Sequence, residues 1–136
     1  RSPFWLVNPV LCKNVTVNDV YCKSFGPNSD GCDPESCTNV LISNCTFDTG
    51  DDCIAIKSGR NADGRRVNVP CSNIVIEHCE MKAGHGGVVI GSEISGGVEN
   101  LYAQHCTMSS PDLDRGIRIK TNTFKVFDNK VSLLIK

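Results

Sequence analysis

Four stretches of the chain repeat one pattern, in which an asparagine is followed by apolar residues one and three places later. The stretches are 12–20, 37–45, 71–79 and 98–106, and their asparagines are Asn14, Asn39, Asn73 and Asn100. They start 25, 34 and 27 residues apart. Short alternating segments rich in β-branched residues, separated by Gly, Asn, Asp and Pro, predict strands rather than helices.

A second strand recurs with the same period, as "CIAIKSG" (53–59), "GVVIGSE" (87–93) and "GIRIKT" (116–121). Strands that return once per repeat predict a solenoid in which each repeat is one coil and equivalent residues stack. The sequence therefore predicts an all-β parallel β-helix with about four to five coils. A leucine-rich repeat lacks support because its leucine spacing is absent, and a β-sandwich would have more evenly spaced strands.

Stacking makes two local predictions. The asparagine column is expected to form a ladder of side-chain amides inside a turn. Cys45, Cys79 and Cys106 occupy equivalent positions and are expected to form an interior column of free thiols, because buried cysteine packs as a small hydrophobic residue. A disulfide or metal use of the nine cysteines is the alternative, but the number is odd and no CxxC pair is present.

Composition narrows the function classes. The 136 residues fit about one domain, and the formal net charge of −1 gives no basic excess for nucleic acid or an anionic membrane surface. No apolar run approaches the roughly 18 residues of a membrane helix. The chain begins "RSPFW", without Met or a visible signal peptide, so we expect it to be an internal piece of a longer protein.

The solenoid also gathers charged residues that lie far apart in the sequence. When the second-strand series is aligned on its isoleucines, Asp51 falls at the same place in its coil as His85, and Lys120 falls in the column of Lys57. Asp30 precedes Asp51 by 21 residues, about one coil, so it should lie near the same row. The residues expected to share this face are Asp30, Asp51, Asp52, His85, Arg118 and Lys120.

Four short motifs in this order resemble those of a known family. They are "NSDG" (28–31), "GDDC" (50–53), "GHGG" (84–87) and "RIK" (118–120), and together they look like the signature motifs of the polygalacturonases, glycoside hydrolase family 28. The resemblance covers roughly residues 1–123 and implies a right-handed parallel β-helix. It implies that residues 1–136 are a partial catalytic domain, the central portion only, with an atypical tail at 124–136.

The resemblance implies hydrolysis of α-1,4-galacturonosyl linkages in cell-wall pectin or polygalacturonate, with inversion. It assigns Asp51 as the general acid and Asp30 and Asp52 as the bases that hold the water. Such chemistry needs one protonated carboxyl and one carboxylate with a wide gap between them, and crowded acids raise one another's pKa. His85 is implied to tune the acid or contact the sugar. The alternatives are a solvated acidic turn, a calcium site and a structural histidine.

Substrate binding is assigned to a second group of residues. Arg118 and Lys120 alternate with isoleucines, so both should point outward, where Arg or Lys suits the carboxylate of each galacturonate. Asn28, Gly84 and Gly86 of the neighbouring motifs are also assigned to substrate binding. An exposed basic strand face is the alternative for the two cations.

One interval is longer than the others. Residues 58–71, "SGRNADGRRVNVPC", are rich in Gly, Asn, Asp and Arg and predict a loop beside the carboxylates. Such a loop would wall off one end of the substrate path, and Arg60, Arg65 and Arg66 would bind a terminal sugar. This segment also resembles the exo-acting members of the family, so release of small products from chain ends is predicted.

No cofactor and no metal is expected. The expected partner is a galacturonan poly- or oligosaccharide, with no nucleic acid and no membrane, and the full-length protein is expected to be a monomer located outside the cell or in the periplasm. Two alternatives stay open. One is a pectate-lyase-like β-helix that uses calcium and elimination, and the other is a non-catalytic carbohydrate-binding or adhesive β-helix.

Overall fold

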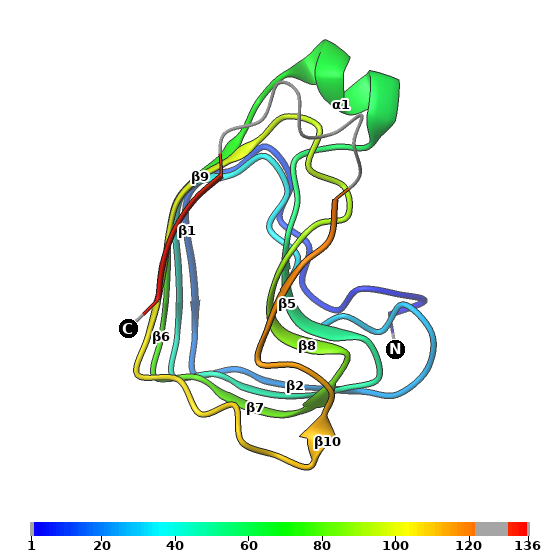
Figure 1. Cartoon of the computed structure of the whole chain (residues 1–136), viewed down its shortest axis with the longest axis vertical. Helices are drawn as coiled ribbons and strands as arrows, with labels where there is room; N and C mark the ends of the chain where they lie inside the picture. Colours follow the sequence, from blue (N-terminus) through cyan, green and yellow to red (C-terminus); the bar gives the residue numbers. More distant parts are fainter. Residues whose placement is uncertain (1, 122–130, 136) are drawn as a thin grey trace.

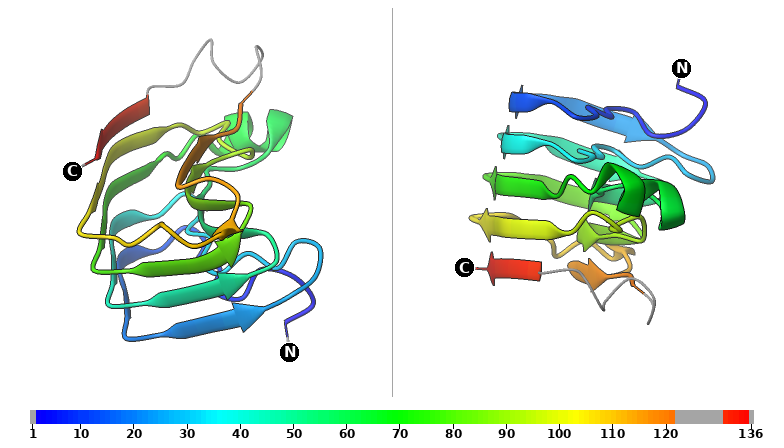
Figure 2. Two further views of the ribbon diagram at one scale, coloured as in Figure 1. Left: turned by 60° about the horizontal axis from the view of Figure 1, so that its bottom comes forward. Right: turned by 90° about the horizontal axis from the view of Figure 1, so that it is seen from above.

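The computed structural model describes residues 2–121 and 131–135. It is an all-β, right-handed parallel β-helix in which three sheets of parallel strands form three sides of a coil (Figure 1). The side views show the coils stacked from the N-terminal end to the C-terminal end (Figure 2). The predicted fold class is therefore confirmed.

The first sheet contains the repeat that the sequence displays most clearly. Its order is β1-β3-β6-β9-β12. The strands are β1 (Lys13–Asn18), β3 (Thr38–Ser43), β6 (Cys71–Glu77), β9 (Val98–Gln104) and β12 (Val131–Ile135). Cα partners in the first four follow the repeat spacing, with Val15 beside Val40, Val40 beside Ile74 and Ile74 beside Leu101. The strand β12 comes from the tail 124–136 and pairs with β9 through a register shift; residues 124–130 and 136 of that tail lie outside the described residues.

Two further sheets complete each coil. The second sheet has the order β10-β7-β4-β2 and the third has the order β11-β8-β5. The second comprises β2 (Tyr21–Ser24), β4 (Thr46–Thr49), β7 (Glu80–Gly84) and β10 (Asp112–Leu113). The third comprises β5 (Asp52–Ile56), β8 (Gly86–Ile90) and β11 (Ile117–Ile119). In the third sheet Ile56, Ile90 and Ile119 are register partners, as the alignment predicted.

The interior is a set of apolar columns. Inward positions of successive coils stack because parallel strands keep equivalent residues in register, and residues such as Ile42 and Ile76 are fully buried. The thiol column is confirmed: Cys45 and Cys79 are buried, Cys106 is half-buried, and all nine cysteines of the chain are free. Burial raises the pKa of the thiols of Cys53 and Cys71 to about 12, so these side chains behave as hydrophobic groups.

The asparagine ladder is present, but its position differs from the prediction. The amide of Asn39 donates to Asn14 at 3.0 Å, Asn73 donates to Asn39 at 3.2 Å, and Asn100 donates to Asn73 at 3.0 Å. These residues are exposed and lie within the first sheet rather than inside a turn. All four have a positive φ, between 54° and 59°, which asparagine tolerates better than most residues.

The long interval was predicted as a loop beside the carboxylates, and both parts of that prediction are wrong. Residues Asn61–Val67 form the helix α1. It follows the C-terminal end of β5, whereas Asp51 and Asp52 lie at the N-terminal end of this strand, so the length of β5 separates them (Figure 1). The helix ends at Asn68, which adopts the left-handed conformation with a φ of 52° and is typical of a helix C-terminus.

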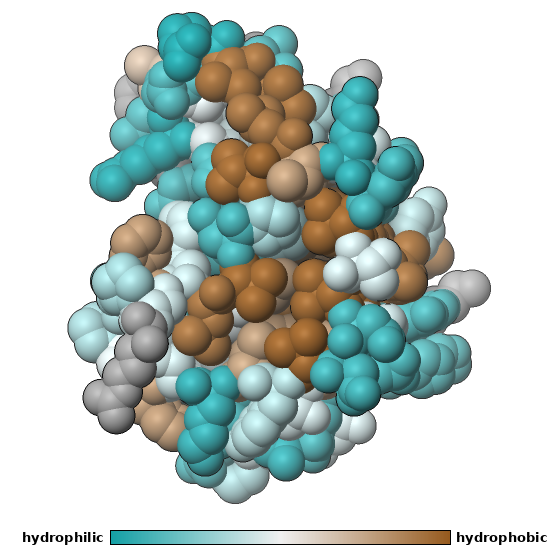
Figure 3. Space-filling model, turned by 180° about the vertical axis from the view of Figure 1, so that it is seen from behind, coloured by the Kyte–Doolittle hydropathy of each residue, from teal (hydrophilic) through white to brown (hydrophobic). Residues whose placement is uncertain are grey.

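The N-terminal end of the solenoid presents apolar side chains. Seen from behind, a band of hydrophobic residues crosses this face (Figure 3). Leu6, Val7, Val15 and Val20 pack against the core but are only partly buried, since no further coil covers them in the described structure. Within residues 2–121 and 131–135, no helix has the length and apolar character needed to cross a membrane.

Candidate active site

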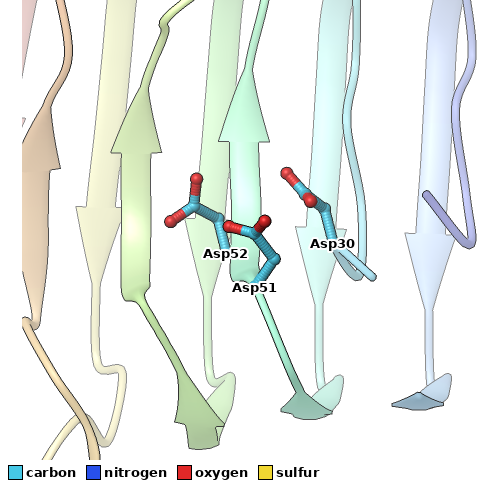
Figure 4. A group of neighbouring side chains, drawn as sticks. All are labelled: Asp30, Asp51 and Asp52. Atoms are coloured by element: carbon cyan, nitrogen blue, oxygen red, sulfur yellow. The ribbon is translucent and has the colours of Figure 1, made fainter. Parts of the chain in front are cut away.

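Three carboxyl groups meet at the start of β5 (Figure 4). Asp52 is the first residue of this strand and Asp51 directly precedes it. Asp30 lies in the neighbouring coil, where Gly31 N donates to the carbonyl of Asp52 at 3.0 Å. One carboxylate oxygen from each residue lies within 4.8 Å of the others. The structure therefore brings Asp30 and the Asp51–Asp52 pair together as predicted.

Asp52 is held by the two cations of the RIK motif. It is fully buried; Lys120 Nζ donates to its Oδ2, and Arg118 Nη1 lies 3.6 Å from its Oδ1. The side chains of Arg118 and Lys120 remain 31% and 24% exposed. They were predicted to point outward and to bind substrate. In the structure, part of their charge also balances a buried carboxylate.

Asp51 is the most accessible of the three acids. Its side chain is 22% exposed, against relative exposures of 3% for Asp30 and 0% for Asp52. The Nδ1 atom of His85 lies 3.2 Å from its Oδ1, and the backbone N–H of Asn28 donates to its Oδ2 at 3.3 Å. Asn28 therefore contacts the cluster through its main chain.

The glycines of the GHGG motif have a packing role. A Cβ at Gly84 would lie 2.4 Å from the carbonyl oxygen of Asp51, and one at Gly86 would lie 2.5 Å from a methyl group of Val89. Both glycines are buried. Their assignment to substrate binding stays a prediction. In the structure both positions are closely packed, because a Cβ at Gly84 would collide with the main chain of Asp51 and one at Gly86 with the side chain of Val89.

The electrostatic environment raises the proton affinity of Asp30. Its burial, followed by the negative charge of Asp51, raises its pKa to about 6, while Lys57 acts in the opposite direction. Crowding of the acids was expected to raise the pKa of one carboxyl group towards neutral pH. The pKa of Asp30 is raised in this way.

A buried ionic network behind the acids was missed. Lys57 is buried, lies 2.9 Å from Glu93 and 3.5 Å from Asp33, and has its Nζ 4.5 Å from the centre of the Trp5 ring. Burial opposes the charge of Glu93, but its hydrogen bond to Lys57 lowers its pKa to about 2. The available signal was Lys57 itself, because a lysine that continues a buried strand needs anionic partners.

The same three acids could surround a cation by distance alone, since hard cations prefer carboxylate oxygens. Two positive side chains already face Asp52, however, and Lys120 donates directly to one of its oxygens. This arrangement supplies the positive charge that a cation would otherwise contribute. The chemistry of the site therefore fits acid–base work without a metal ion.

The fold and the site define a parallel β-helix protein with an acidic cluster at the start of one strand. Residues 2–131 match the model of the family "Glycosyl hydrolases family 28". The chain therefore belongs to this family.

Individual relatives agree with the family. A probable polygalacturonase of Vitis vinifera is 36% identical over 124 residues, which is 89% of this chain and 25% of that protein. An exo-poly-alpha-D-galacturonosidase of Dickeya chrysanthemi is 31% identical over 110 residues, 80% of this chain and 18% of that protein. An exopolygalacturonase structure from Thermotoga maritima matches with a TM-score of 0.87 at 47% identity, over 90% of this chain and 28% of that one. The chain thus spans a quarter or less of these curated relatives.

Proposed function

We propose that the protein containing this chain hydrolyses α-1,4-galacturonosyl linkages in polygalacturonate, acting from chain ends and with inversion. The observation that carries the proposal is the cluster of Asp30, Asp51 and Asp52, with one acid accessible and two held behind it. Membership of the family and the exo-acting relatives support the substrate and the mode.

Asp51 is proposed as the general acid. A general acid must reach the leaving oxygen, and Asp51 is the most exposed carboxyl of the cluster. Proton affinity alone would favour Asp30, whose pKa is raised to about 6 by burial. We give accessibility more weight, because a buried acid cannot contact a polysaccharide. His85 lies beside Asp51 and is proposed to orient its carboxyl group.

Asp30 and Asp52 are proposed to hold the attacking water. A wide gap between acid and base was expected, but one oxygen of each aspartate lies within 4.8 Å of the others, less than the roughly 6.5–9.5 Å usual for inverting enzymes. A single water can bridge two oxygens at such a distance, since each O–H···O bond spans about 2.7–2.8 Å. Water held between Asp30 and Asp52 would then lie beside the sugar that Asp51 protonates.

Arg118 and Lys120 are proposed to bind the carboxylate of a galacturonate at the cleavage site. Each retains solvent exposure in addition to its contact with Asp52. A guanidinium with spare donors suits a planar carboxylate, because two parallel hydrogen bonds can form.

The exo mode is proposed from the exo-acting relatives. Arg60 and Arg65 are exposed near the helix α1, and Arg66 is paired with Asp63 at 2.7 Å. These cations lie at the far end of β5 from the acids, about 17 Å away at roughly 3.3 Å per residue, so they are not proposed to bind the terminal sugar of a released mono- or digalacturonate. The same proposal places the full-length protein outside the cell or in the periplasm as a monomer, where its polymeric substrate is accessible.

Reducing-end release from polygalacturonate, with and without a chelator, tests the reaction. Activity that survives chelation and gives no ultraviolet-absorbing product supports hydrolysis. Chelator-sensitive formation of an unsaturated product would instead identify a calcium-dependent lyase, which the three clustered carboxylates could also serve. No release of sugar by the full-length protein would favour a non-catalytic binding β-helix.

Early products test mode and stereochemistry. Mono- or digalacturonate appearing with little loss of viscosity supports the exo mode, whereas a rapid viscosity fall with a ladder of oligomers overturns it. Proton NMR of the first product distinguishes the β anomer of an inverting reaction from the α anomer of a retaining one.

A further inference from the structure

Asp33 is a buried carboxyl group that the proposed reaction does not use. It has no exposed surface, and no N–H or hydroxyl group of the described residues donates a hydrogen bond to either of its side-chain oxygens. It lies three residues after Asp30, and a hydrogen bond between the two carboxyl groups affects the pKa of each. Two carboxylates cannot hydrogen-bond to each other unless one of them carries a proton.

The only cation that reaches Asp33 within the described residues is already engaged. Lys57 Nζ lies 3.5 Å from Asp33 Oδ2 but only 2.9 Å from Glu93 Oε2. The positive charge of Lys57 is therefore already balanced by Glu93, and little of it is left to stabilise a negative charge on Asp30 or Asp33. Burying a second and a third negative charge beside it would leave carboxylates without compensation.

Charge balance over the whole site leads to the same point. Five carboxyl groups face three permanent cations: the acids are Asp30, Asp33, Asp51, Asp52 and Glu93, and the cations are Lys57, Arg118 and Lys120. The proposed general acid must carry one proton. A second proton on one of the remaining acids brings the two charges into balance.

We propose that Asp33 is a positioning residue that stays protonated and donates its carboxyl O–H to Asp30, holding Asp30 as an oriented carboxylate base. This inference rests on the proposed function, in which Asp30 holds the attacking water. The proton remains on Asp33 during the reaction, so no group is oxidised and no bond to substrate is formed.

The groups around Asp33 act consistently with this role. Burial and the negative charge of Asp30 raise the pKa of Asp33 to about 9, and Lys57 opposes the rise. The hydrogen bond from Asp33 acts on Asp30 in the other sense and lowers its pKa, against burial and the charges of Asp51 and Asp52. The neighbouring thiol of Cys32 stays neutral, chiefly because burial raises its pKa. The amide of Asn8 binds the main-chain oxygen of Asp33 and leaves the carboxyl free.

The first test needs no activity. Asp33→Asn removes the ionisable group but keeps its shape and an N–H donor. If Asp33 is protonated in the folded protein, the free energy of unfolding falls as pH rises from about 4 to about 9. In this range the carboxyl group releases its proton in the unfolded chain but keeps it in the folded one. The melting temperature of Asp33→Asn in the intact protein should therefore rise relative to wild type over this window, while the exposed Asp19→Asn shows no such trend.

The opposite result overturns the proposal. If Asp33 were an ionised partner of Lys57, Asp33→Asn would be less stable than wild type at every pH above about 4, because a buried ion pair would be broken. A difference in melting temperature that does not change with pH would overturn it as well. Because this measurement uses only folding, it decides the state of Asp33 even if the protein releases no sugar.

The second test follows the pH dependence of kcat/KM. Asp33→Asn keeps an N–H donor to Asp30. The apparent pKa of the acidic limb of the profile should therefore stay within a few tenths of a pH unit of the wild-type value. Asp33→Leu fills the site without a donor, and the acidic limb should move to higher pH by roughly half a unit to one unit. A downward shift in Asp33→Asn would mean that a negative charge had been removed, and would contradict a protonated Asp33. Should Asp33→Leu not fold, the Asp33→Asn profile alone gives this decision.

Discussion

The imidazole of His85 lies against the carboxyl group of Asp51, with Nδ1 3.2 Å from Oδ1, although 34 residues separate them in the chain. The backbone repeats the contact, because His85 N donates to the carbonyl of Asp51 at 3.0 Å. Parallel pairing of β5 with β8 produces both contacts, since one turn of the solenoid returns the chain to the same place. An exposed acid thereby gains a fixed neighbour that can orient it.

Loss of the proposed acid should abolish turnover. Asp51→Asn is nearly isosteric, so the fold and substrate binding should persist while kcat falls by about 10²- to 10⁴-fold, the usual contribution of a positioned acid or base. Asp30→Asn and Asp52→Asn should lose activity on a similar scale. Reducing-sugar release measures the rates. The control is Asp19→Asn, since Asp19 is exposed and has a left-handed backbone that asparagine accepts.

The assignment of Asp51 fails if Asp51→Asn retains more than about a tenth of the wild-type rate. Circular dichroism and melting curves of each variant separate a chemical loss from a folding loss.

The two cations should differ in their kinetic effects. Arg118→Ala should raise KM for polygalacturonate by about 10- to 100-fold, as expected for a charge-assisted hydrogen bond of roughly 1.5–3 kcal/mol. Lys120→Ala should lower kcat as well, because Lys120 donates directly to the buried Asp52. Both effects should shrink on methyl-esterified substrate, which lacks the carboxylate.

Steady-state kinetics on the two substrates measure this difference. Lys82→Ala is the control, since Lys82 is an exposed lysine of β7 paired with Glu80. Equal losses on charged and esterified substrates would assign Arg118 and Lys120 a structural role only.

Activity should fall at acidic pH. Asp30 must be unprotonated to activate water, and burial raises its pKa to about 6. Below this pH, kcat/KM should decline about tenfold per pH unit as the base is protonated. With an ordinary aspartate the decline would begin only near pH 4. A pH–rate profile without a break between pH 5 and pH 7 would contradict the role of Asp30.

The same shift predicts an effect on stability. Because the pKa of Asp30 in the folded protein is raised above its ordinary value of 3.8, the folded protein loses stability as pH rises from about 4 to about 6. Asp30→Asn removes this loss and should stabilise the protein at neutral pH by at most about 3 kcal/mol. Chemical denaturation at pH 4 and pH 7 measures the change, and a gain at pH 4 as large as that at pH 7 would argue against the shift.

The asparagine ladder should contribute to stability through both its amide bonds and its backbone conformation. Asn39 both gives and accepts a ladder bond and has a φ of 59°. Asn39→Ala should cost about 2–3 kcal/mol, since it loses hydrogen bonds and places alanine in a left-handed conformation. Asn39→Gly keeps the backbone conformation easily, so it should be less destabilising. Equal losses in urea denaturation would mean that the backbone conformation is irrelevant.

The sequence by itself determined the coil period, the interior columns and the group of acids. These follow from one-dimensional information, because a strand that recurs each turn must bury equivalent positions, and register then places Asp51 beside His85. The family motifs marked the same residues. The sequence could not show how buried each carboxyl is, since burial depends on neighbouring coils.

Only the tertiary structure decided the ionic arrangement of the site. It placed Arg118 and Lys120 on the buried Asp52, and it showed how closely Gly84 and Gly86 are packed. It also placed the interval after β5 in a helix away from the acids. It also revealed Asp33 beside Asp30, with Lys57 held by Glu93. Charges in a low-dielectric interior interact according to distance and desolvation, and the coils fix both quantities only when they stack.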